Sequence, residues 1–217
     1  MVKVLGIDEA GRGPVIGPLV IAGVMLEESK VNKTLKEADD SKKLTPKRRE
    51  QLFKKFSKST TNKIIIIEPS EIDEALASQE LNLNWLEAHK SAEIINELKP
   101  DEAHLDSPSP NTEHYKAYVR NLLDNKDIEL FVGHKMESKS KLVAAASVLA
   151  KVTRDREIEE IKKKYGDIGP GYMSNQVTQK FLEENWEKYP EIFRKSWISW
   201  QNHKIKKEQK ALADFKS

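Results

Sequence analysis

Acidic residues stand at the ends of three apolar segments of the chain. Asp8 and Glu9 close an N-terminal apolar run, Asp106 closes a second, and Glu137 follows a third by a few residues. Because sites in layered α/β proteins assemble at strand ends, we expect these carboxylates to converge. Because the chain contains 35 aspartates and glutamates, the simplest interpretation of any single one is a solvent-exposed surface residue. Asp8 differs, since a carboxylate that closes a buried strand needs a cation or several hydrogen-bond donors.

A cluster of carboxylates predicts divalent metal ions. No lysine or arginine is held by spacing where it would neutralise the acids, and the chain contains no cysteine. Oxygen ligands without histidine or cysteine suit Mg²⁺ or Mn²⁺ more than Zn²⁺. Such ions, paired about 3.5 to 4 Å apart, serve phosphoryl chemistry by activating water and stabilising the leaving oxygen.

Three further segments suit a phosphate-bearing ligand. The run Gly11-Arg12-Gly13 lets the backbone approach a ligand and places Arg12 to meet a phosphate, although alone it is typical of a flexible turn. Residues 41–58 hold eight basic residues and one acid, which favours a polyanionic partner over a solvated helix face. Tyr172 lies in a polar loop, where it would stack on a sugar or base.

Five apolar segments are predicted to be the strands that position these residues, over 2–8, 19–26, 63–68, 102–106 and 128–132. The first is apolar on both faces, which is typical of a central strand. The short glycine-rich connection that follows it predicts an antiparallel pair with the second. Because consecutive strand residues point to opposite faces, Glu9 joins Asp8 only if the backbone turns sharply there.

Helical spacing and capping residues predict helices over 45–58, 78–98 and 141–165, then a loop over 166–175 and two helices separated near Pro190. An antiparallel start followed by strands that alternate with helices describes an α/β fold, a five-stranded mixed sheet with helices on both faces. We expect one domain over residues 1–174, with residues 175–217 forming a C-terminal helical extension packed on it.

Composition restricts the class of protein. The 217 residues are 38% hydrophobic and 33% charged, which excludes a collagen-like chain or a disulfide scaffold, and the net charge of +2 does not by itself imply nucleic acid. The N-terminus reaches acids before any apolar run of signal-peptide length, and the apolar stretch 15–26 is too short for a membrane span. We expect a cytoplasmic monomer with no membrane partner.

Several motifs in order resemble type 2 ribonuclease H, in its archaeal and eukaryotic branch. They are residues 6–18 around Gly11-Arg12-Gly13, Asp40-Ser41-Lys42-Lys43-Leu44, His104-Leu105-Asp106-Ser107, residues 145–155, Gly169-Pro170-Gly171-Tyr172 and Arg194-Lys195-Ser196-Trp197. The resemblance implies the ribonuclease H-like fold and a metal-dependent endoribonuclease that uses two Mg²⁺ or Mn²⁺ ions. Its substrates would be RNA–DNA hybrids and duplex DNA, incised 5′ to an embedded ribonucleotide, with 3′-hydroxyl and 5′-phosphate ends.

The resemblance also implies roles for single residues. Asp8 would bridge the two ions, and Glu9, Asp106 and Glu137 would complete their shells, although the family usually has aspartate where Glu137 stands. Asp155 is the alternative fourth acid, but it matches a separate position where we expect a helix contact. The remaining matches concern substrate: Gly11, Arg12 and Gly13 read the ribose 2′-hydroxyl, Tyr172 packs on the next sugar, and Lys42, Lys43 and Ser147 contact phosphates.

Two other functions stay open at this point. A structure-specific DNA nuclease such as a junction resolvase would share the acids but have no use for a 2′-hydroxyl reader. A non-catalytic nucleic-acid-binding module would use the basic segment 41–58 and show no metal-dependent turnover.

Overall fold

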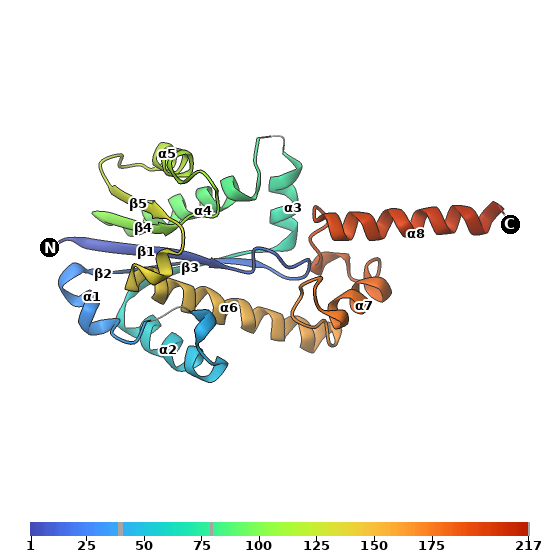
Figure 1. Ribbon diagram of the computed structural model, residues 1–217, viewed down its shortest axis with the longest axis horizontal. Helices are drawn as coiled ribbons and strands as arrows, with labels where there is room; N and C mark the ends of the chain where they lie inside the picture. The colour runs from blue at the N-terminus through green and yellow to red at the C-terminus, as the bar shows by residue number, and fades with distance from the viewer. Residues whose placement is uncertain (39–40, 79, 217) are drawn as a thin grey trace.

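A five-stranded mixed sheet runs through the centre of the protein in the order β3-β2-β1-β4-β5 (Figure 1). The computed structural model describes residues 1–38, 41–78 and 80–216, with the side chains of all of these except residues 42 and 210–216. The first three strands are antiparallel, whereas β4 and β5 run parallel to β1. The strands are β1 (Lys3–Ala10), β2 (Leu19–Glu27), β3 (Thr61–Ile67), β4 (Glu102–Asp106) and β5 (Glu129–Gly133).

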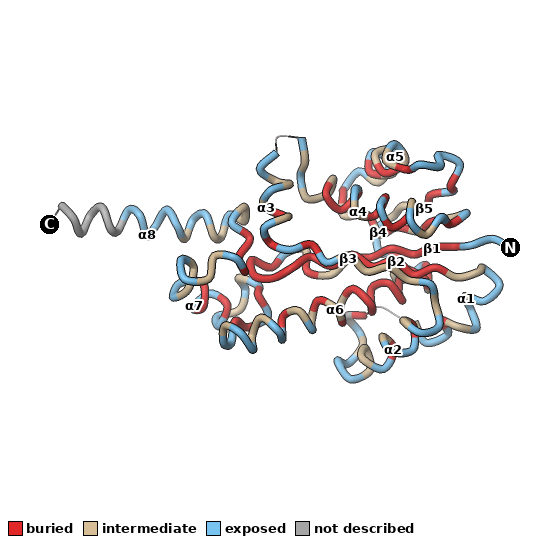
Figure 2. Tube along the Cα trace, turned by 180° about the vertical axis from the view of Figure 1, so that it is seen from behind, coloured by how far each residue is buried: buried red, intermediate tan, exposed pale blue. Residues whose placement is uncertain are grey.

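Helices cover both faces of this sheet (Figure 1). One face carries α3 (Pro69–Ala77), α4 (Leu83–Leu98) and α5 (Thr112–Leu122), and the other carries α1 (Glu28–Thr34), α2 (Pro46–Ser59) and α6 (Lys141–Tyr165). β1 serves both cores, because Leu5 and Ile7 pack on the α4 face while Val4 packs on the α6 face. Buried residues are accordingly concentrated in β1, β2 and the first half of α6 (Figure 2).

Gly6 lets α6 lie directly against β1. A Cβ added to Gly6 would come within 2.3 Å of backbone atoms of Leu142 and Val143, a distance that no real side chain tolerates. The helix residues that follow, Ala144, Ala145 and Ala146, are small and buried. This close approach brings the middle of α6 level with the C-terminal end of β1.

The C-terminal segment builds a third small core beyond the end of the sheet. Here α7 (Gln176–Asn185) and η3 (Pro190–Ile192) pack against residues 15–16 and the second half of α6. The last helix, α8 (Ile198–Lys216), begins on this core and then extends away from the body of the protein (Figure 1). The two helices predicted on either side of Pro190 are therefore confirmed, and the domain boundary at residue 174 stays a prediction.

The predicted fold class, the five strands and their antiparallel start are confirmed. The condition that Glu9 joins Asp8 only through a sharp turn of the backbone is wrong, because β1 continues in regular pairing with β2 through Ala10 and both residues still line one pocket. Three short helices, α1, α3 and α5, were not predicted, and the helix expected from residue 78 begins at Leu83 because the Asn82 side chain caps it. In the described part of the chain, no helix is both long and apolar enough to cross a membrane.

We predict that Gly6→Ala destabilises the fold by about 2 to 3 kcal/mol, because the methyl group meets helix backbone that cannot move aside. Urea unfolding followed by circular dichroism measures this change. Gly133→Ala is the matched control, since its methyl would meet the flexible side chain of Met136 at 3.2 Å. Equal midpoints for the two variants would contradict the close approach of α6 to β1.

Candidate active site

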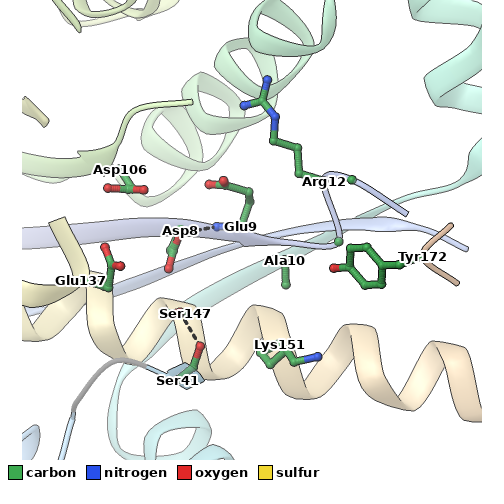
Figure 3. Close-up of a pocket in the computed structure, with 12 residues that line it drawn as sticks. Asp8, Glu9, Ala10, Arg12, Ser41, Asp106, Glu137, Ser147, Lys151 and Tyr172 are labelled. Atoms are coloured by element: carbon green, nitrogen blue, oxygen red, sulfur yellow. Dashed lines mark hydrogen bonds between the residues drawn. The ribbon is translucent and has the colours of Figure 1, made fainter. Parts of the chain in front are cut away.

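The site lies where β1 extends beyond the end of its parallel neighbour, β4. β1 pairs with β4 only as far as the Ile7–Leu105 pair, whereas its pairing with β2 continues to Ala10. Beyond Ile7 one side of β1 is therefore open, and a pocket of about 320 Å³ forms there. Its lining comes from six separate segments (Figure 3): Asp8, Glu9, Ala10, Gly11, Arg12, Gly13, Ser41, Asp106, Glu137, Ser147, Lys151 and Tyr172.

Asp8 and Glu9 point to opposite sides of β1 and still border the same pocket (Figure 3). Asp8 is buried on the α6 side near Ser147, and its Oδ1 accepts a hydrogen bond of 2.8 Å from the Glu9 amide. Burial raises the pKa of Asp8 well above its usual range, and the neighbouring charges of Glu9 and Asp106 add to the rise. Glu9 faces α4, where burial and the nearby carboxylate of Glu87 raise its pKa as well.

The other two acids enter from the ends of β4 and β5. Asp106 is the last residue of β4, and its Oδ1 accepts a hydrogen bond of 2.8 Å from the Met136 amide at the start of η2 (Met136–Ser138). Glu137 stands on η2 with its carboxylate on the Asp8 side of the pocket (Figure 3). His134 Nδ1 lies 3.2 Å from the Ser107 carbonyl oxygen, so it ties the two strand ends together, consistent with a structural role.

The pocket's chemistry fits a divalent cation. Of its two cationic side chains, Arg12 is bound to Glu87 and Lys151 is bound to Asp155 at 2.6 Å, so both are engaged by acids outside the group of four. A divalent ion would offset the burial and mutual repulsion that disfavour ionised Asp8 and Glu9. Among the described residues no group of three or more acids or histidines lies close enough together to hold one metal ion, so the four acids line the pocket without enclosing a single site.

The Arg12 side chain, for which a phosphate contact is expected, is directed at α4 rather than into the pocket (Figure 3). Its Nη1 donates to Glu87 Oε2 at 3.1 Å and its Nη2 donates to Asn84 Oδ1, so it reaches away from the pocket towards α4 (Figure 3). The backbone of the turn stays at the pocket. Gly11 has a φ of +87°, and a Cβ on Gly13 would lie 3.7 Å from the Tyr172 ring.

Three residues, Ser147, Lys42 and Lys43, are expected to contact phosphates, and one of the side chains that the structure describes lines the pocket. Ser147 lines the pocket, and its Oγ shares a hydrogen bond of 2.8 Å with Ser41 Oγ. Lys43 is exposed on η1 (Ser41–Lys43) outside the pocket lining, and the side chain of Lys42 lies outside the described residues. Asp155 forms the expected helix contact, since its partner Lys151 is one turn earlier on α6.

The basic segment 41–58 is less unbalanced in the structure than in the sequence. Arg48 and Lys55 both bind Glu37, and the one acid of the segment, Glu50, binds Arg156 of α6. These ion pairs with residues outside the segment hold α2 against its neighbours. Part of the positive charge of the segment therefore has a structural role.

Three residues that border or support the site had no role in the sequence analysis. Lys151 lines the pocket, Glu87 holds Arg12, and Arg194 hydrogen bonds to the glycine turn from behind. Glu87 carried a signal, because it lies in line with Ser91 and Ile95 on the buried stripe of α4, where a charge needs a partner. Nothing in the local pattern around Arg194 indicated that it would be fully buried.

A mixed sheet with acids at the ends of β1 and β4 defines a metal-dependent nuclease of the ribonuclease H-like class. The family model for ribonuclease HII matches residues 5–200. The ribonuclease HII of Thermococcus sibiricus is 43% identical over 216 residues, which cover 95% of this chain and 94% of that protein. The chain belongs to the ribonuclease HII family, whose members are metal-dependent endoribonucleases that act on RNA–DNA hybrids.

Solved structures agree with this assignment. The ribonuclease H2 of Pyrococcus horikoshii OT3 superposes with a TM-score of 0.86 at 38% identity, covering 94% of this chain and 98% of that one. Bst-RNase HIII, solved in complex with Mn²⁺, superposes with a TM-score of 0.78 at 17% identity, covering 94% of this chain and 70% of that one. At that identity the second structure supports the fold alone.

We predict that Asp8→Asn raises the stability of the metal-free protein, since it removes a buried charge that repels Glu9 and Asp106. A gain of about 1 to 2 kcal/mol, or roughly 3 to 6 °C in Tm, is expected in EDTA by differential scanning calorimetry. Asp155→Asn is the control and should lower Tm, because it breaks the ion pair with Lys151. A lower Tm for Asp8→Asn would contradict the repulsion.

Proposed function

We propose that this ribonuclease HII incises duplex DNA 5′ to a single embedded ribonucleotide, as well as the RNA strand of hybrids, and leaves 3′-hydroxyl and 5′-phosphate ends. One observation carries the proposal. The four carboxylates line the same pocket as the glycine turn and Tyr172. The residues proposed to bind the metal ions and the residues proposed to recognise the ribose therefore face one common space. Location and oligomeric state remain predictions from the sequence.

We assign Asp8, Glu9, Asp106 and Glu137 to the binding of two Mg²⁺ or Mn²⁺ ions. When bound, such ions supply an activated water and stabilise charge on the leaving oxygen. The protein's own contribution is to hold four acids around one pocket, with Asp8 near the C-terminal end of β1 and Asp106 anchored by the Met136 amide. No covalent intermediate with the enzyme is needed.

Glu137 serves as the fourth acid in this proposal. Glutamate is one methylene longer than the aspartate usual in the family, and η2 holds it within the pocket lining. The alternative acid, Asp155, is paired with Lys151 at 2.6 Å and with Arg49 at 3.7 Å. The pocket therefore supports Glu137 rather than Asp155 in this role.

The glycine turn and Tyr172 give the proposed selectivity for ribose. Gly13 and Tyr172 pack side by side, so a sugar in the pocket would touch both. Backbone groups of a turn without side chains approach a 2′-hydroxyl closely enough to hydrogen bond to it. The Tyr172 ring is about one-third exposed and lies 5.3 Å from the Arg154 guanidinium, which supports it from behind.

The proposal is tested with an end-labelled DNA duplex that contains one ribonucleotide, mapped at nucleotide resolution with Mg²⁺, Mn²⁺ or EDTA. We expect one cut on the 5′ side of the ribonucleotide, none in EDTA and none in an all-DNA duplex. Asp8→Asn should lower the rate at least about 1,000-fold while binding persists. Cutting of junctions or all-DNA duplexes would favour a resolvase, and binding without turnover in every metal would favour a non-catalytic module.

We predict that Tyr172→Ala slows incision at a lone ribonucleotide about 10- to 100-fold, and slows cleavage of a uniform RNA–DNA hybrid much less. The reason is that a lone ribonucleotide offers a single sugar to recognise, so loss of one stacking partner is not made up elsewhere. Single-turnover rates on both substrates measure the difference. Tyr165→Ala, which alters a tyrosine outside the pocket, is the control, and an unchanged rate for Tyr172→Ala would remove its assigned role.

A further inference from the structure

The glycine turn is held from behind by one buried arginine. Arg194 donates from Nη2 to the Gly11 carbonyl oxygen at 2.6 Å, from Nη1 to the Arg12 carbonyl oxygen at 2.9 Å, and from Nε to the Gly17 carbonyl oxygen at 2.9 Å. Its side chain is fully buried. A planar guanidinium with donors in fixed directions therefore sets the orientation of the peptide groups in the turn.

A second donor completes this support. Trp197 Nε1 donates to the Gly13 carbonyl oxygen at 3.2 Å, and its ring lies 4.8 Å from the Arg194 guanidinium. The carbonyl groups of Gly11, Arg12 and Gly13 thus all accept bonds from the C-terminal segment. In a planar trans peptide the carbonyl and the next N–H point opposite ways, so the amides of Arg12 and Gly13 point away from Arg194.

Arg194 is itself firmly anchored. Its amide donates to the Val15 carbonyl oxygen at 2.9 Å. Asp73 of α3 accepts from the amides of Lys195 and Ser196 at 2.9 Å and from the Ser196 hydroxyl at 2.6 Å. The guanidinium is thus fixed by its own backbone as well as by its acceptors, so it acts as a rigid template.

Burial of a charge makes this arrangement selective for one shape of the turn. Loss of solvation lowers the pKa of Arg194 to about 9, and the cation is held chiefly by carbonyl dipoles rather than by a directly bound carboxylate among the contacts above. A turn in another conformation would leave donors of a buried cation without acceptors.

We propose that Arg194 is the positioning residue that makes the turn at 11–13 able to discriminate ribose from deoxyribose. It acts through the turn's backbone, not by touching substrate. This inference rests on the proposed function, since it assumes that the turn reads the 2′-hydroxyl. It assigns the discrimination to a residue about 180 positions away in the chain.

The test separates ribose reading from general binding. Fluorescence anisotropy in Ca²⁺ gives the Kd for a DNA duplex with one ribonucleotide and for the all-DNA duplex of the same sequence, with denaturing gels confirming intact strands. The readout is the Kd for the all-DNA duplex divided by the Kd for the duplex that contains the ribonucleotide. Arg194→Lys keeps the charge but loses the planar fork, and Arg156→Lys makes the same exchange at an exposed position.

We expect Arg194→Lys to lower the ratio at least fivefold towards one while its Kd for all-DNA stays within twofold of the parent. Arg156→Lys should retain the parent ratio. An unchanged ratio, or parallel weakening on both duplexes, would overturn the inference, because either shows that Arg194 supports the fold and not the reading of ribose. A parent ratio of one would show that the turn does not read the 2′-hydroxyl on binding and would overturn the inference, whereas loss of the cut in the incision assay would refute the proposed function itself.

Trp197→Phe keeps the test decisive if Arg194→Lys does not fold. It removes only the indole donor to Gly13 and retains an aromatic ring beside Arg194. A two- to threefold fall in the ratio, without weaker binding of all-DNA, is expected. An unchanged ratio in this folded variant would overturn the inference in that case.

Discussion

The placement of negative charge in the opening between β1 and β4 is the constraint on which the rest of the structure depends. Asp8 is buried there, and Glu9 and Asp106 lie close enough for their charges to repel it. Burying like charges is unfavourable, so the surrounding fold must be stable without any contribution from them. The two cores on either face of the sheet supply that stability, and β1 belongs to both of them.

The opening itself arises from a difference in strand length. β4 ends at Asp106 while β1 continues with only β2 beside it, so two consecutive residues of β1 border a space that a longer β4 would have filled. Gly6 then allows α6 to lie close enough for Ser147 to reach Asp8. The site is thus formed by rigid elements, which hold acids in place before any ligand arrives.

Two arginines hold the glycine turn from different sides. The Arg12 side chain ties the turn to Glu87 and Asn84 on α4, and Arg194 holds its carbonyl groups from the opposite end of the chain. Neither guanidinium is directed at the pocket. Positive charge near the acids therefore stabilises backbone shape, and neutralisation of the acids is left to the metal ions that the family requires.

Much of the fold and of the site was predictable from the sequence, because apolar periodicity records burial locally. The five strands, the buried helix 141–165 and the acids at strand ends all followed from residues close together in the chain. The short helices α1, α3 and α5 were missed because they are brief, although α5 carried signals, since Asn111 caps it and Tyr115 and Val119 lie one turn apart on its buried face. Asn82 as the cap of α4 was missed as well, because a predicted helix extended across it.

What only the tertiary structure decided concerns partners that lie far apart in the sequence. Arg12 binds Glu87 on α4, Lys151 binds Asp155 at the edge of the pocket, and Arg194 reaches Gly11 across the whole chain. Local pattern shows which residues carry charge but not which opposite charge or dipole folding brings beside them. The choice of partner depends on how the elements pack, so the sequence alone determined the acids and the strands, whereas the packing decided what each cation does.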